Sequence, residues 1–109
     1  MIRLMSWVVV LSVALVGIPA FAAKGDGDAA AGKELFGTKC GICHNADSKE
    51  KKIGPGLQGV KDGKLPSGKD ATYENLLKNL NEGGGGMPAF DKLITSEEKD
   101  NVIAYVLTL

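Results

Sequence analysis

The chain has few cysteine and histidine residues, and its formal net charge is zero. Its 109 residues include two cysteines and one histidine, which together fall one ligand short of a tetrahedral zinc site. Its 13 basic residues balance 13 acidic residues, so neither nucleic acid nor an anionic membrane surface is indicated as a partner. Aromatic residues make up only 6% of the chain. A single small domain with so few large side chains has a modest core and usually needs a covalent crosslink or a bound cofactor for stability.

The first 22 residues differ from the rest and predict a secretory signal peptide. Arg3 precedes an almost wholly apolar run over residues 4–18, and Ala20-Phe21-Ala22 supplies the small residues that a signal peptidase reads. The alternative is an uncleaved membrane anchor, because about 20 apolar residues are long enough to span a bilayer. We expect cleavage after Ala22. This would leave a single domain over residues 23–109, exported to the periplasm without membrane insertion.

Both cysteines and the histidine fall in one motif, Cys40-Gly41-Ile42-Cys43-His44. This spacing attaches a c-type haem, because the two thiols can form thioethers with the haem vinyl groups while the adjacent imidazole reaches the iron. A thioredoxin-like redox pair would lack its β-α-β surroundings. A simple disulfide would not explain His44. We therefore predict one covalently bound haem c, attached through Cys40 and Cys43, with His44 as an iron ligand.

The opposite side of the iron needs a second ligand, and Met87 is the only methionine beyond residue 22. Four glycines precede it, and we expect this run to be a flexible approach that lets the sulfur reach the haem. A thioether is a soft, neutral ligand that raises the reduction potential relative to harder ligands. The alternatives are a methionine that fills a gap in the core, or a lysine ligand, for which the sequence has no signal.

Three segments predict α-helices, and no strand pattern or internal repeat is present. The first runs from Ala29 to Lys39 after an aspartate cap, and the second from about Ala71 to Asn81. The third follows Thr95-Ser96-Glu97-Glu98, which has the form of a capping box. The loops are long for so small a domain. We expect them to be organised by wrapping a cofactor.

Gly32 lies inside the first predicted helix, on the same face as Phe36 and Cys40. A glycine within a helix costs about 1 kcal/mol relative to alanine. Close approach by another helix would explain its presence. The alternative is an incidental glycine in a short helix.

Four separated features resemble the class I c-type cytochromes, which are small monohaem electron carriers. They are the Gly32-to-Cys40 helix pattern, the motif ending at His44, the segment Gly54-Pro55-Gly56-Leu57, and Met87. The resemblance covers residues 28–109. It implies an all-α cytochrome c fold, with about three principal helices and long loops wrapped around one covalently bound haem.

The resemblance also implies individual roles. The carbonyl of Pro55 would accept a hydrogen bond from His44, and Leu57 would pack on the haem. Gly32 and Phe36 would cross the C-terminal helix near Tyr105.

We therefore expect a periplasmic one-electron carrier that acts between redox partner proteins, as a monomer and not as an enzyme. The alternative is a haem enzyme or ligand sensor, peroxidase-like or binding a diatomic gas, in which Met87 dissociates. Lys49, Lys51 and Lys52 are more typical of a solvated face than of a docking patch. Even so, lysines around an exposed haem edge would steer an acidic partner.

Overall fold

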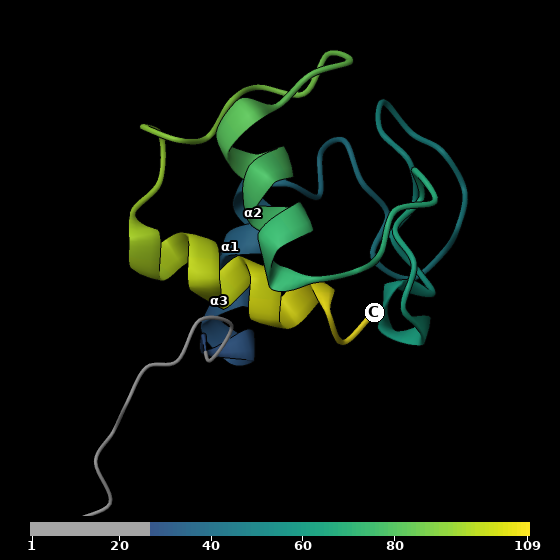
Figure 1. The fold of residues 1–109 in the computed structure, drawn as a ribbon, viewed down its shortest axis with the longest axis horizontal. Coiled ribbons are helices and arrows are strands. Elements are labelled where there is room, and N and C mark those ends of the chain that lie inside the picture. Colours follow the sequence, from purple (N-terminus) through teal and green to yellow (C-terminus); the bar gives the residue numbers. More distant parts are fainter. Residues whose placement is uncertain (1–26) are drawn as a thin grey trace, which may run out of the picture.

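The computed structural model describes residues 27–109, so the predicted signal peptide and its cleavage site lie outside the described residues. The α-helices are α1 (Ala29–Lys39), α2 (Tyr73–Glu82) and α3 (Ser96–Val106), and the short 3₁₀ helix η1 (Val60–Asp62) lies between α1 and α2. Figure 1 shows α1 crossing behind α3, with α2 above α3 in this view. Residues 27–109 contain no strand longer than an isolated bridge. The prediction of an all-α fold with three principal helices is confirmed.

Local side-chain caps set where the helices begin. Asp28 accepts hydrogen bonds from the backbone of Ala30 and Ala31, and the Thr95–Glu98 capping box is complete. The second helix begins at Tyr73 rather than near Ala71, because Thr72 is extended and acts as the cap. The predicted helices are therefore present, and only one boundary moves by more than a residue.

The crossing of α1 and α3 depends on the glycine inside α1. A Cβ atom built on Gly32 would overlap the backbone carbonyl of Asn101 in α3. Next to this contact, the rings of Phe36 and Tyr105 meet edge to face, with centroids 5.4 Å apart and planes at 67°. The expectation that Gly32 permits close approach by another helix is confirmed.

Polar contacts attach the N-terminal end of α1 and the start of α2 to the same helix. The backbone N–H of Asp28 donates to the side chain of Asn101 at 2.8 Å, and the Tyr73 hydroxyl donates to Asp100 at 2.6 Å. Because Asn101 and Asp100 are neighbours, α3 holds both other helices near its middle. This arrangement makes α3 the central support of the fold.

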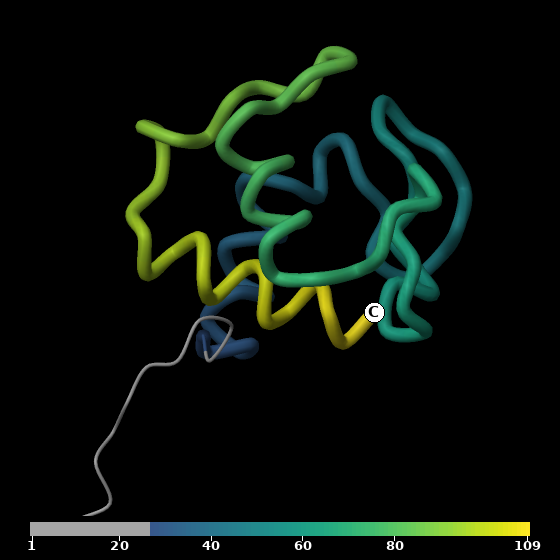
Figure 2. The backbone as a smooth tube through the Cα atoms, in the orientation of Figure 1, coloured from purple at the N-terminus to yellow at the C-terminus, as the bar shows by residue number. Residues whose placement is uncertain are grey.

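The loops lie on two sides of the helices (Figure 2). The long connection between α1 and α2 runs along one side, and the connection between α2 and α3 runs along another. Within the described part of the chain, no helix has both the length and the apolar composition needed to cross a membrane. The space between the loops and the helices contains the candidate site.

Candidate functional site

A cavity of about 500 Å³ opens between the helices and the loops. This volume is within the range of cofactor pockets, which are roughly 300–1,000 Å³. Its apolar walls come from Leu57, Leu65, Leu76, Leu80, Phe90, Val102, Ile103 and Val106. All of the residues predicted to bind haem also line it: Cys40, Cys43, His44, Pro55, Leu57 and Met87. The fold therefore brings together residues that are far apart in the sequence.

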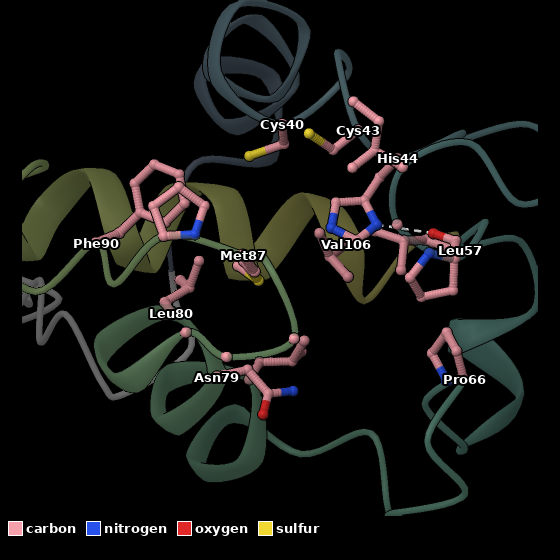
Figure 3. A pocket seen from close by; sticks show the side chains of 18 of the residues that line it. Cys40, Cys43, His44, Leu57, Pro66, Asn79, Leu80, Met87, Phe90 and Val106 are labelled. Carbon is pink, nitrogen blue, oxygen red and sulfur yellow. Dashed lines mark hydrogen bonds between the residues drawn. The ribbon is translucent and has the colours of Figure 1, made fainter.

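The attachment motif forms a tight turn at the C-terminal end of α1. Cys40 caps this helix, and its carbonyl accepts the backbone N–H groups of Cys43 at 3.1 Å and His44 at 2.9 Å. Figure 3 shows the two sulfur atoms at one edge of the cavity, next to the imidazole. The turn thus places both thiols and the imidazole at the same opening.

Burial, with a further contribution from Cys43, raises the pKa of the Cys40 thiol above its usual value. Reactive dithiol pairs have the opposite property, because a lowered pKa supplies the attacking thiolate. The environment of Cys40 therefore does not favour thiol–disulfide exchange. This observation argues against the alternative of a thioredoxin-like redox pair.

The orientation of the His44 ring is set by a carbonyl from the next loop. The Nδ1 atom of His44 lies 2.7 Å from the carbonyl oxygen of Pro55. Since a carbonyl can only accept, Nδ1 carries a proton, and in the neutral ring Nε2 is then the nitrogen with the lone pair. In Figure 3 this second ring nitrogen is turned away from the carbonyl and into the cavity. A neutral imidazole held in this way is the form that ligates iron.

Further contacts tie this supporting loop to the attachment motif. The N–H of Gly54 donates to the carbonyl of Cys43 at 2.7 Å, and the Lys52 ammonium donates to the carbonyl of Gly41 at 3.0 Å. A Cβ atom built on Gly54 would lie 2.5 Å from Cε1 of His44. The backbone of Gly54 therefore packs directly against the imidazole.

Met87 lies across the cavity from the imidazole. Its side chain is half-buried, and Figure 3 shows it between His44 and the pair Leu80 and Phe90. Gly84 and Met87 form an isolated bridge in which each N–H donates to the other's carbonyl at 3.0 Å. The glycine run is thus a hydrogen-bonded turn, whereas the sequence suggested a flexible approach.

Leu65 and Asn79 are among the cavity residues that were not predicted from the sequence. Leu65 is buried although it lies in a glycine- and lysine-rich loop without periodicity, so no local signal identified it. Asn79 lines the cavity from α2 and was not considered. The helical spacing of Leu76, Asn79, Leu80 and Gly83 would have found it, since these positions share one face.

The chemistry of the donor groups fits a haem. Two thiols, an imidazole with a free nitrogen and a thioether surround an apolar cavity. Among residues 27–109 there is no group of three or more histidine, cysteine, aspartate or glutamate side chains placed to hold a metal ion. The cavity is therefore suited to a large apolar ring that brings its own iron, for which His44 and Met87 would offer ligand atoms.

Comparisons with known proteins agree with this arrangement. Residues 27–106 match the family model described as cytochrome C oxidase, cbb3-type, subunit III. Cytochrome c6 of Rippkaea orientalis is 36% identical over 81 residues, which cover 74% of this chain and 70% of that protein. Cytochrome c6 of Leptolyngbya boryana is 32% identical over 80 residues, covering 73% and 91% respectively. The structure of cytochrome c6 from the diatom Phaeodactylum tricornutum has a TM-score of 0.56 and 29% identity, covering 75% of this chain and 93% of the diatom chain.

Proposed function

The chain belongs to the class I c-type cytochromes, and we propose that Cys40, Cys43, His44 and Met87 hold its haem. It is a monohaem protein that carries electrons between redox partners, and it is not an enzyme. It has one covalently bound haem c. The assignment of individual residues to the haem rests on the geometry of the cavity.

Each residue has a separate task in this proposal. Cys40 and Cys43 form the thioether links, and His44 offers Nε2 because its Nδ1–H donates a hydrogen bond to the Pro55 carbonyl. Met87 supplies a neutral sulfur from across the cavity, and Leu57 packs against the ring. When bound, the haem supplies a one-electron couple between ferrous and ferric iron.

The surrounding side chains keep water away from this couple. The apolar walls form a surface of low polarity, so few dipoles need to reorient when the charge changes. With His44 and Met87 both holding the haem, no site would remain on its iron for a substrate. No protein acid, base or nucleophile is required for electron transfer.

The observation that carries the proposal is the placement of the free Nε2 of His44 and the Met87 side chain on opposite sides of one apolar cavity. A redox titration with visible spectra tests it. We expect a methionine-sulfur-to-ferric-iron charge-transfer band at neutral pH. A high-spin ferric spectrum would contradict it and support the alternative of an open haem enzyme or sensor.

Replacing Met87 by alanine tests the second ligand directly. We expect Met87→Ala to lower the reduction potential and to open the iron to added ligands, because the soft sulfur favours ferrous iron. The matched control is Leu93→Ala, since Leu93 is exposed and does not line the cavity. An unchanged potential in Met87→Ala would refute Met87 as the ligand.

The N-terminal assignment is a separate part of the proposal. Residues 1–22 act as a secretory signal peptide, and the domain over residues 23–109 functions as a monomer in the periplasm. Mass spectrometry of the periplasmic fraction should find a mature chain that begins at Ala23. An intact N-terminus in the membrane fraction would contradict cleavage and support the uncleaved anchor.

The partner surface lies at the mouth of the same cavity. Ile42 and Ile53 line it and are 69% and 70% exposed, although both are large and apolar. Lys39 and Lys51 line it as well. This surface suits a redox partner with acidic residues around an apolar contact, because lysines steer such a partner and the isoleucines bury apolar area. Lys51→Glu should slow electron exchange with an acidic partner and weaken the salt dependence of that exchange. Lys92→Glu, at a residue that does not line the cavity, should change neither.

A further inference from the structure

The segment before Met87 forms a defined turn. Gly84 and Met87 exchange two backbone hydrogen bonds of 3.0 Å, which close a hairpin around Gly85 and Gly86. These two central residues have φ values of 61° and 92°. Positive φ at both central positions is characteristic of a type I′ turn, which favours glycine and asparagine. The glycines therefore meet a conformational requirement of the turn.

Gly83 makes a different and closer contact. Its φ of 63° and ψ of −145° lie in a region that is essentially restricted to glycine. A Cβ atom built on it would lie 2.5 Å from the carbonyl oxygen of Met87, 2.7 Å from the carbonyl carbon of Pro88 and 2.8 Å from the nitrogen of Ala89. All three are backbone atoms, so a rotamer change cannot relieve the overlap. The end of α2 thus packs directly on the backbone that carries the methionine.

The chain after Met87 is attached to the same helix. The N–H of Phe90 donates to the carbonyl of Leu80 at 2.6 Å, and the Phe90 side chain is buried in the core. The N–H of Gly83 donates to the carbonyl of Asn79 at 2.9 Å and ends α2. Both sides of Met87 are therefore connected to the last turn of α2.

We propose that Gly83 is a positioning residue for the methionine ligand: by letting the backbone of Met87 rest on the end of α2, it keeps the sulfur at the cavity. The four-glycine run then retains the ligand and does not serve to release it. This inference rests on the proposed function, because it requires Met87 to ligate the iron.

Gly85, two residues away, provides a control for the effect of a positive φ. Its φ of 61° is nearly the same as the 63° of Gly83, so an alanine at either position adopts an unfavourable positive φ. However, a Cβ atom built on Gly85 would meet no other atom within 4 Å. Both alanine variants therefore carry an unfavourable positive φ, and Gly83→Ala adds the contact with the Met87 backbone and a ψ of −145° that is also unfavourable for alanine.

The experiment compares Gly83→Ala, Gly85→Ala and the unmodified holoprotein. The ferric charge-transfer band reports the iron–sulfur bond, and titration with imidazole measures how readily an added ligand displaces the sulfur. We expect Gly83→Ala to lose the band or to bind imidazole at least about tenfold more tightly than the unmodified protein. Gly85→Ala should keep the band, and its imidazole affinity should stay within about threefold of that of the unmodified protein. Unchanged values in Gly83→Ala, or equal changes in both variants, would overturn the inference.

Met87→Ala serves as the third variant and separates the two claims. If Met87→Ala keeps the band, the proposed ligation fails, and the inference fails with it. If Met87→Ala loses the band while Gly83→Ala keeps both the band and the imidazole affinity of the unmodified protein, only the inference fails.

Hydrogen exchange in the unmodified holoprotein covers the case in which Gly83→Ala does not fold. The N–H groups of Gly84 and Met87 should exchange more slowly than those of Gly85 and Gly86, because the first two close the turn. Equal exchange at all four positions would overturn the inference.

Discussion

Replacing Gly54 by alanine should disturb the histidine ligand without changing any charge. The new Cβ atom would lie 2.5 Å from Cε1, 2.9 Å from Nδ1 and 3.1 Å from Nε2 of His44. Ordinary van der Waals contacts begin at 3.4 Å, so the ring has to withdraw by about 0.9 Å, the difference between 3.4 and 2.5 Å. The imidazole is the group that moves, because Gly54 is held by the carbonyl of Cys43.

A displacement of this size breaks the hydrogen bond that orients the ring. Directed away from Pro55, it would lengthen the 2.7 Å separation between Nδ1 and the Pro55 oxygen to at most about 3.6 Å, which is beyond hydrogen-bonding range. Loss of one such bond costs roughly 0.5–1.5 kcal/mol. Because the bond makes the imidazole a stronger donor, its loss disfavours ferric iron and raises the reduction potential. A tenfold change in the equilibrium constant of a one-electron couple corresponds to 59 mV, so this free energy limits the rise in reduction potential to about 20–60 mV.

Spectroelectrochemical titration of the holoprotein measures this change. Gly41→Ala is the matched control, because its Cβ atom would have its nearest contact at an ordinary 3.4 Å from the Phe36 carbonyl. The ferrous protein should also show loss of the His44 Nδ1–H proton signal in Gly54→Ala. The reasoning would be refuted by an unchanged potential in Gly54→Ala, or by an equal rise in Gly41→Ala.

Two further predictions concern stability. Gly32→Ala should destabilise the fold by about 1–3 kcal/mol, because the added methyl group forces α1 away from Asn101. Gly37→Ala, with open space around it, should be neutral or stabilising. Urea unfolding measures the stability of both variants, and equal stabilities would contradict the prediction. The hydrogen bond to Asp100, followed by burial, raises the pKa of Tyr73 to about 12. Since the unfolded tyrosine titrates near pH 10, this contact stabilises the fold fully below about pH 10, and the stabilisation is lost as pH rises through about 12. Tyr73→Phe should therefore unfold more easily at neutral pH and lose less stability between those pH values, and parallel losses in both proteins would show that Tyr73 is not the titrating group.

Local patterns in the sequence determined the helices and one half of the site. Asp28, Thr72 and the Thr95–Glu98 pair each contact backbone within three residues, so their caps could be recognised without a structure. The same holds for the cysteines and His44, whose spacing is itself the chemical requirement. Short-range geometry of this kind is the same in every fold, which is why these predictions needed no tertiary information.

Resemblance to a family extended these predictions to contacts that spacing does not encode. Pro55 lies eleven positions after His44, and nothing local predicts that its carbonyl meets Nδ1. The packing of Gly54 against the imidazole was not anticipated at all. Such contacts depend on how a whole loop folds back.

Only the tertiary structure decided the conformation of the segment that carries Met87. Glycine has little backbone preference, so a run of four glycines predicts flexibility when it is considered alone. The backbone of Met87 rests on Gly83, and Phe90 is tied to Leu80, so contacts with α2 select one turn from the many that glycine allows. The sequence thus determined which residues have the right chemistry for the haem, whereas long-range packing determined that they face one cavity.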